Sequence, residues 1–226
     1  MTIQKLEWDS EFFGRRIGRL QMDCLGNELP EFPSELDLIY VETACENDCC
    51  APQSHPTWFD AGRKLTFTAD THDGQTAPSI IQLTTQSPEL QKLAWLSGHQ
   101  SRYRLDPNFT KEEYRRLYTR WIDACLEGQW DATILGIERH GELAGFVTVE
   151  SLTDHARIGL IAVHSDHQGQ GLSSHLIRAA KISAKEKGHS ELRVSTQHTN
   201  HAAIYAYLNG GFRSLSSIQH YHWWVK

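Results

Sequence analysis

The chain has 226 residues and a formal net charge of −6 with its histidines neutral. This acidic balance argues against nucleic acid as a partner, because a phosphate backbone demands a basic surface. No apolar run approaches the length that spans a bilayer, and no apolar signal segment stands at the N-terminus, so we expect neither a membrane partner nor secretion. Five cysteines without such a signal indicate reduced thiols and a cytoplasmic location.

The first hundred residues alternate short strand patterns with polar breaks. Strands are predicted at residues 16–22, 37–43, 64–68 and 80–84, with a polar segment at 70–78 and a helix at 88–97. This order predicts a smaller α+β N-terminal domain over residues 1–90 and a second domain over residues 91–226. Cys45, Cys49 and Cys50 cluster, but no second pair and no histidine follow at the spacing of a zinc site, so no metal is expected.

The middle of the chain predicts a helix followed by a sheet. Residues 109–127 carry apolar or aromatic side chains at helical spacing, which we interpret as a core-packing stripe. Residues 132–139 and 145–150 form a predicted hairpin, and the sheet continues into residues 157–163. Parallel and antiparallel strands with helices between them predict a mixed α/β fold.

A glycine-rich turn separates that last strand from the next helix. The turn contains Gly169 and Gly171, and residues 172–188 then show a helical pattern. Such a turn can present several unpaired backbone N–H groups to one anion, and the helix N-terminus adds about half a positive charge. The turn is therefore a candidate phosphate cradle. It is not a Walker loop, which needs Lys and then Ser or Thr where Leu172 and Ser173 stand.

A second pattern follows a predicted strand at residues 191–196. Residues 200–212 have the spacing Asn-x-x-Ala-x-x-x-Tyr-x-x-x-Gly-Phe. Its Asn200 suits a helix N-cap, and Gly210 and Gly211 suit the end of a short helix. The stretch therefore predicts a short capped helix behind the phosphate cradle.

Together, the turn at residues 168–173 and the pattern at 200–212 resemble the pyrophosphate loop and the C-terminal motif of the GNAT superfamily of acyl-CoA-dependent N-acyltransferases. They occur in the family's order, with a helix and a strand between them. The resemblance covers roughly residues 130–226. Ser173 departs from the Gly or Ala that the family has there, a small change because serine is also compact.

The resemblance implies the GNAT fold, with a smaller α+β domain before it, and acetyl-CoA as co-substrate. The donor would lie in an opening between two splayed parallel strands, here residues 157–163 and 191–196, and backbone groups would polarise its thioester carbonyl. The implied donor-binding residues are Ile161, Ala162, Val163, Gln168, Gly169, Gln170, Gly171, Leu172, Ser173 and Asn200. For Asn200, helix capping explains the residue about as well as donor binding.

Two residues are expected to be catalytic. Tyr207 matches the family's tyrosine that protonates the departing CoA thiolate, with core packing as the alternative. Glu150 ends a strand that would border the acceptor and is the candidate base, although a solvated carboxylate explains it too. His164 is a weaker candidate, and a water chain could also serve, because an amino-sugar amine is partly neutral near pH 7–8.

The acceptor pocket is predicted at Arg102, Tyr103 and Arg104, because guanidinium groups bind phosphates and a tyrosine ring can stack on a sugar or base. These arginines could equally pair with the protein's own carboxylates. A looser similarity over the whole chain, at residues 6–14 and 101–104, points to GNAT enzymes that acetylate a nucleotide-linked amino-deoxysugar.

That similarity predicts a small-molecule acceptor, a nucleotide amino-sugar. Two alternatives remain: acetylation of another small amine, antibiotic or peptide, and a non-catalytic acyl-CoA-binding module, against which Tyr207 argues. The tryptophan-rich C-terminal stretch could pair with a second subunit to form a homodimer.

Overall fold

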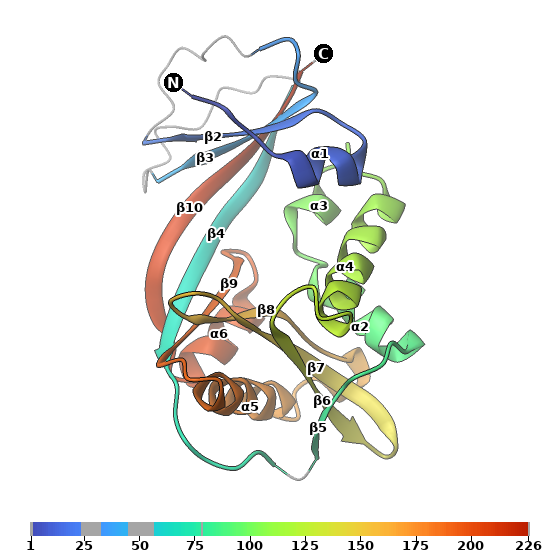
Figure 1. The fold of residues 1–226 in the computed structure, drawn as a ribbon, viewed down its shortest axis with the longest axis vertical. Coiled ribbons are helices and arrows are strands. Elements are labelled where there is room, and N and C mark those ends of the chain that lie inside the picture. Colours follow the sequence, from blue (N-terminus) through green and yellow to red (C-terminus); the bar gives the residue numbers. More distant parts are fainter. Residues whose placement is uncertain (1, 24–32, 45–56, 78, 226) are drawn as a thin grey trace. The chain divides into compact units, whose positions relative to one another are not determined.

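A computed structural model describes residues 2–23, 33–44, 57–77 and 79–225 (Figure 1). The predicted cysteine cluster, Cys45, Cys49 and Cys50, lies outside these residues. The chain divides into two compact units, one of Met1–Leu65 with Ser216–Lys226 and one of Thr66–Leu215. The long strands β4 (Trp58–Asp70) and β10 (Arg213–Trp224) contribute residues to both.

In its described residues, the first unit is a small sheet with one helix. Besides its parts of β4 and β10, it contains β1 (Gln4–Lys5), α1 (Glu7–Phe13), β2 (Ile17–Met22) and β3 (Leu38–Thr43). β2 runs parallel to β3, and β10 runs antiparallel to β3 from Gln219↔Thr43 to Trp224↔Leu38. The side chains of Leu20, Ile39 and Tyr221 belong to its buried core. The C-terminal strand therefore completes the sheet that the N-terminal residues begin.

The second unit carries the remaining elements. These are β5 (Ile80–Gln82), α2 (Pro88–Ser97), α3 (Arg102–Leu105), α4 (Lys111–Leu126), β6 (Ala132–Arg139), β7 (Glu142–Ser151), β8 (Ala156–Val163), a 3-10 turn (Ser165–His167), α5 (Leu172–Glu186), β9 (Glu191–Gln197) and α6 (His201–Asn209). Its strand order is β4-β9-β8-β7-β6-β5. β5 to β8 are antiparallel neighbours and β8 runs parallel to β9, so the predicted mixed α/β fold is confirmed.

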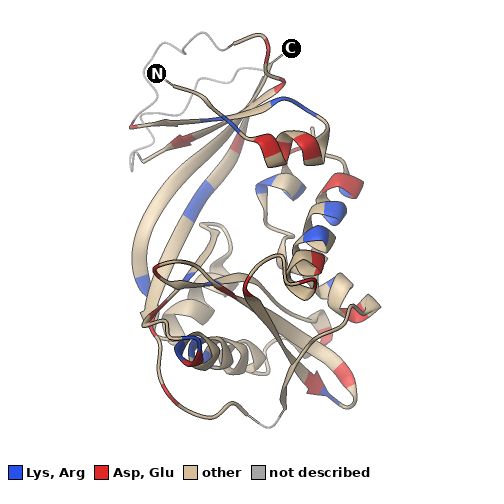
Figure 2. Ribbon diagram, viewed as in Figure 1, with Lys and Arg blue, Asp and Glu red and all other residues tan. Residues whose placement is uncertain are grey.

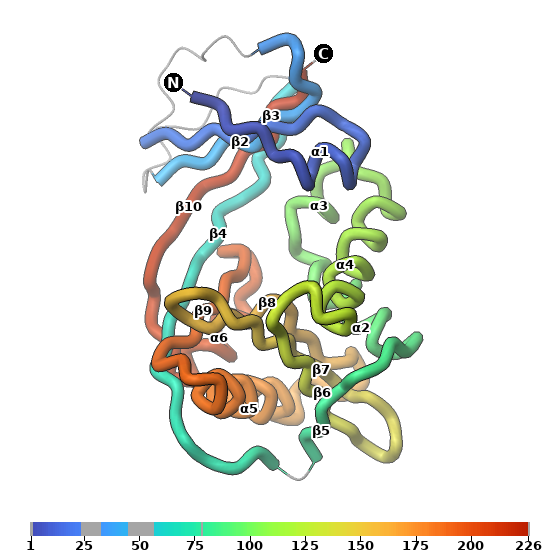
Figure 3. Tube along the Cα trace, viewed as in Figure 1, coloured from blue at the N-terminus to red at the C-terminus, as the bar shows by residue number. Residues whose placement is uncertain are grey.

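Helices cover both faces of this second sheet (Figure 1). α5 packs against β6, β7 and β8 on one face, and α2 and α4 pack on the other. The connection from β4 to β5 runs past α5 (Figure 3), where the Thr71 hydroxyl donates to the backbone carbonyl of His189 at 2.6 Å. Residues 71–77 of this connection therefore lie beside α5.

Local sequence explains why α4 forms where it does. The Thr110 side chain accepts a hydrogen bond from the Glu113 backbone N–H, and the Glu113 carboxylate accepts one from the Thr110 N–H, a complete capping box. Tyr114, Leu117 and Ile122 form part of its buried stripe, as predicted. Figure 2 shows Lys and Arg interleaved with Asp and Glu on the same helix, the composition of a solvated face.

The two units differ from the predicted division after residue 90. The first unit ends at Leu65 and includes Ser216–Lys226, because β10 hydrogen-bonds to β3. These units are groups of mutual contacts, whereas the predicted domains at 1–90 and 91–226 are stretches that would fold separately. The domain boundary stays a prediction.

Candidate active site

The parallel strands β8 and β9 separate part-way along their length. They pair at Ala156↔Leu192, Arg157↔Arg193 and Ile158↔Val194, and the described pairing between them ends there. Both strands continue beyond this point, β8 to Val163 and β9 to Gln197. From residue 159 onward, β8 therefore forms no regular backbone pairing with β9 in the described structure. A splayed opening between two strands requires such an unpaired edge.

A β-bulge lies where the opening begins. On the other side of β8, the register with β7 shifts between Val147↔Ile161 and Val149↔Ile158, so that Gly159 and Leu160 oppose the single residue Thr148. The Thr148 hydroxyl accepts a hydrogen bond from the Leu160 N–H at 2.8 Å, replacing the missing ladder bond. The bulge turns the following backbone groups of β8, which include those of Ile161, Ala162 and Val163.

The glycine-rich turn has the geometry of an anion site. Gly169 and Gly171 have φ values of 74° and 75°, which glycine adopts without strain, and a Cβ at either position would meet no atom within 4 Å. Among the described residues, no hydrogen bond is formed by the backbone N–H groups of residues 169–173, five in succession. Gly171 is the N-cap of α5 and supplies no side-chain cap. These donors at a helix N-terminus fit a phosphate or pyrophosphate group.

Side chains of the turn fold it onto the end of β8. The Gln168 amide donates to the backbone carbonyl of Val163 at 3.2 Å, and the Gln170 amide donates to that of Asp166 at 3.3 Å. Both glutamines therefore shape the loop, and Leu172 and Ser173 begin α5. The predicted anion loop and the predicted thioester strand are thus joined by one direct hydrogen bond, that from Gln168 to Val163.

Tyr207 lies in α6 with only 4% of its surface exposed. Its ring packs against Phe67 at 6.0 Å and Phe212 at 5.8 Å between centroids. Burial raises the pKa of its phenol above the ordinary value, so the group keeps its proton well into the alkaline range. The Lys181 ammonium of α5 donates to the backbone carbonyl of Gly210 at 2.7 Å and fixes the end of the same helix.

Glu150 is buried and fully engaged. One carboxylate oxygen accepts from Trp121 Nε1 at 2.7 Å, and the other accepts from Arg157 Nε at 2.9 Å and Nη2 at 2.5 Å. Only 3% of the Glu150 side chain is exposed, against 43% of that of Arg157. Such a carboxylate is suited to orienting Arg157 and the bulge. Its predicted role as the base stays a prediction.

Sequence reasoning missed the partners of Glu150. Trp121 stood in the aromatic stripe interpreted as packing, and it does stack on Tyr118, with ring centroids 6.2 Å apart. Its indole N–H also satisfies the carboxylate, which no helical spacing could reveal. Arg157 lies in a predicted strand, and the signal that the sequence offers for its role is a charged residue among apolar ones.

The remaining predicted residues fall into two places. Asn200 caps α6, its side-chain oxygen accepting from the Ala203 N–H at 3.3 Å, so the capping alternative is observed and donor binding stays a prediction. Arg102 and Tyr103 lie in the short helix α3 and contact each other, the guanidinium donating to the phenol oxygen at 2.9 Å. Arg104 is exposed on the same helix. Their role in acceptor binding stays a prediction.

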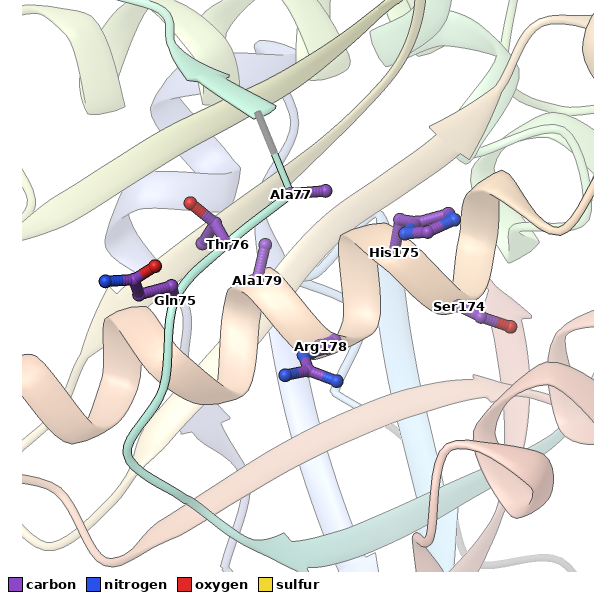
Figure 4. Close-up of a pocket in the computed structure, with 7 residues that line it drawn as sticks. All are labelled: Gln75, Thr76, Ala77, Ser174, His175, Arg178 and Ala179. Atoms are coloured by element: carbon purple, nitrogen blue, oxygen red, sulfur yellow. The ribbon is translucent and has the colours of Figure 1, made fainter. Parts of the chain in front are cut away.

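A cavity of about 380 Å³ lies beside the first turns of α5 (Figure 4). It is lined by Gln75, Thr76, Ala77, Ser174, His175, Arg178 and Ala179. None of the predicted donor-binding or catalytic residues lines it, so this cavity is separate from the opening between β8 and β9. Within the described residues no three His, Cys, Asp or Glu side chains gather as a metal site would require.

The burial of one cysteine thiol and three tyrosine phenols predicts a loss of stability at alkaline pH. Burial raises the pKa of the Cys125 thiol and of the Tyr114 phenol to about 12, and raises those of Tyr118 and Tyr207 as well. In the unfolded chain cysteine and tyrosine ionise at about pH 8.5 and 10, so unfolding releases protons above those pH values.

The stability that these four buried groups contribute is therefore complete below about pH 8.5 and is lost as the pH rises toward about 12. We expect the Tm to decline from about pH 9 upward in thermal unfolding scans. Tyr118→Phe should flatten the decline above pH 10, whereas Tyr205→Phe, on a side chain 71% exposed, should not. A Tm that stays constant to pH 11 would contradict the expectation.

The splayed parallel strands and the glycine-rich turn before α5 are features that the resemblance to acyl-CoA-dependent acyltransferases predicts. The profile of the Acetyltransferase (GNAT) family matches residues 93–212, and the chain belongs to this family. It is an acetyl-transferring enzyme of a family that uses acetyl-CoA. No helix in the described part of the chain is both long and apolar enough to cross a membrane.

Two curated relatives extend the similarity beyond that region. The chain is 31% identical over 215 residues to a dTDP-fucosamine acetyltransferase of Escherichia coli O6:H1, covering 93% of this chain and 92% of that protein. It is 25% identical to the spore coat polysaccharide biosynthesis protein SpsD of Bacillus subtilis, over 84% of this chain and 68% of that one. Both alignments include most of the first unit.

Solved structures agree on the fold. A GNAT-family acetyltransferase of Novosphingobium aromaticivorans superposes with a TM-score of 0.55 at 18% identity, over 84% of this chain and 75% of that chain. A tandem GNAT protein from the clavulanic acid biosynthesis pathway gives 0.56 at 17% identity, over 85% and 65%. At these identities the structures establish the fold.

Proposed function

We propose that the enzyme transfers the acetyl group of acetyl-CoA to the amine of a nucleotide-linked amino-deoxysugar. The observation that carries this proposal is the similarity to a dTDP-fucosamine acetyltransferase along 93% of the chain, since it extends beyond the GNAT-matching residues 93–212. The second relative, a polysaccharide biosynthesis protein, supports sugar chemistry independently.

The donor's place in this proposal is the loop and the opening. The five backbone N–H groups of residues 169–173 would hold the pyrophosphate, and Gln168 holds that loop to the end of β8. Acetyl-CoA, when bound, supplies an activated thioester. The β8 backbone at Ile161, Ala162 and Val163 lines the unpaired edge, where N–H groups would stabilise negative charge on the carbonyl oxygen.

The proposed chemistry is direct attack by a neutral amine. Nitrogen–carbon bond formation is accompanied by loss of an amine proton and cleavage of the carbon–sulfur bond. Tyr207 is proposed to donate a hydrogen bond to the leaving sulfur, because its raised pKa keeps the phenol protonated, and the released thiolate takes its proton from water. Glu150 is proposed to hold Arg157, with water carrying the amine proton away.

The test is release of CoA thiol from acetyl-CoA across TDP- and UDP-linked amino-sugars, polyamines and peptide amines. We expect turnover confined to nucleotide amino-sugars. Matched nucleotide sugars that carry a hydroxyl in place of the amine serve as the control and should give only background hydrolysis. Turnover confined to polyamines or peptides would leave the family assignment standing and overturn the acceptor.

A further inference from the structure

Charged side chains form a row across the strands β7, β8 and β9 of the second unit, and a hydroxyl of β4 is hydrogen-bonded to it. Glu150 on β7 stands opposite Arg157 on β8, and Arg157 stands opposite Arg193 on β9. Arg193 Nε donates to Glu191 at 2.8 Å, and the same Glu191 oxygen accepts from the Thr68 hydroxyl of β4 at 2.6 Å. Residues opposite each other on neighbouring strands project from the same face, so these side chains share one face of the sheet. We call Glu150, Arg157, Arg193 and Glu191 the polar row.

The centre of the polar row is an arrangement that packing alone does not favour. Arg157 and Arg193 are in register on adjacent strands, which lie about 4.8 Å apart, and like charges directly opposite each other destabilise a sheet. Each guanidinium is paired with a carboxylate, Arg157 with Glu150 of the neighbouring strand β7 and Arg193 with Glu191 of its own strand. These ion pairs offset the repulsion between the two neighbouring arginines, but they do not explain why two arginines stand side by side.

The polar row also retains hydrogen-bonding capacity on its exposed side. Arg157 Nη1, both Nη atoms of Arg193 and one oxygen of Glu191 take part in no hydrogen bond among the described residues. The side chains of Arg157, Arg193 and Glu191 are 43%, 30% and 31% exposed. Planar donors and an acceptor, already fixed in orientation by their neighbours, are thus available to a ligand on this face.

The position of the polar row connects it to the reaction. Arg157 and Arg193 form the second of the three pairs between β8 and β9, and the opening begins just after the third, Ile158↔Val194. One strand residue advances about 3.3 Å, so Arg157 lies about 7 Å along β8 from Gly159, the first residue of the opening. An acceptor whose amine enters the opening would place its sugar ring near the guanidinium groups of Arg157 and Arg193.

We propose that the polar row binds ring hydroxyl groups of the acceptor sugar and so selects the sugar. The inference rests on the proposed function. A hydroxyl both donates and accepts, which matches guanidinium N–H groups beside a carboxylate oxygen. Two carboxylates neutralise the two guanidinium groups, and Asp154 adds a further negative charge near Arg193. This charge balance disfavours a diphosphate dianion on the same side chains.

The test compares Arg193→Gln and Arg193→Lys with Arg139→Gln, a control at the far end of β6. For each we measure the KM for the nucleotide amino-sugar, the KM for acetyl-CoA, the Kd for the free nucleoside diphosphate and the Tm. For Arg193→Gln we expect the amino-sugar KM to rise roughly 10- to 100-fold, with the acetyl-CoA KM and the nucleotide Kd unchanged. Arg193→Lys, which keeps the charge but loses the planar fork, should give a smaller rise.

An unchanged amino-sugar KM in both variants would overturn the proposal and make the polar row purely structural. A nucleotide Kd that weakens in parallel with the KM would overturn it in favour of phosphate binding. If the variants fail to fold, wild-type KM values for acceptors lacking single ring hydroxyls decide, and equal values would overturn it. Wild-type inactivity toward every nucleotide amino-sugar would instead overturn the proposed function and this inference together.

Discussion

Replacing Tyr207 by phenylalanine is expected to lower kcat about 100-fold or more while leaving the KM for acetyl-CoA unchanged. The pKa of a thiol is about 8.5 and that of a phenol about 10, so a thiolate is a weaker base than a phenolate. The phenol therefore contributes chiefly by donating a hydrogen bond to the sulfur as negative charge develops on it, an interaction made in the transition state rather than in donor binding. Steady-state kinetics with varied acetyl-CoA measure both constants.

The matched control is Tyr205→Phe. Tyr205 lies on the same helix two residues earlier, is 71% exposed, and should tolerate the change with wild-type kcat. Removing the Tyr207 hydroxyl keeps the ring contacts with Phe67 and Phe212, so the fold should survive. Wild-type kcat in Tyr207→Phe would reassign the residue to core packing and revive the reading of the protein as an acyl-CoA-binding module.

Elements with a strong local signal could be predicted from the sequence. The helix at Lys111–Leu126 combines a capping box with a buried stripe, and the strand at Glu191–Gln197 alternates along its length. The helices α1 and α3 were not predicted: α1 is short and opens without a side-chain cap, and α3 has four residues. The pairing of β10 with β3 was not predicted either, because the local sequence of a strand does not indicate which strand about 180 residues away it pairs with.

The candidate site also contains both features with a local sequence signal and features that depend on long-range packing. The anion loop and Tyr207 lie in contiguous stretches whose spacing is visible in the sequence, and the loop has the expected open glycines. The surroundings of Glu150 depend on the packing of α4 against the sheet, which brings Trp121 Nε1 within 2.7 Å of Glu150 Oε1 although the two residues are 29 positions apart. Likewise, only the sheet order shows that Arg157 and Arg193 are neighbours. Long-range packing thus decides what a charged strand residue does.

Replacing Gly159 by alanine is expected to destabilise the enzyme and to reduce its activity. A Cβ at this position would lie 1.9 Å from Glu150 Oε1 and 2.9 Å from Thr148 Oγ1, both impossible contacts. The carboxylate cannot simply swing aside, since Trp121 and Arg157 hold its two oxygens. Either the bulge or this network must shift, at a cost of about 1–3 kcal/mol, as overpacking does in other cores.

For a chain of this size that cost corresponds to a fall in Tm of roughly 2–12 °C in thermal unfolding. The fall should be partly relieved when Gly159→Ala is combined with Glu150→Ala, because the shorter side chain vacates the space that the new methyl group needs. A double-mutant cycle on the free energy of unfolding isolates this coupling. Strict additivity of the two single changes would show that the carboxylate does not confine Gly159. Coupling with a matching loss of kcat would show that Glu150 acts on the reaction through the shape of β8, at the residue where the opening begins.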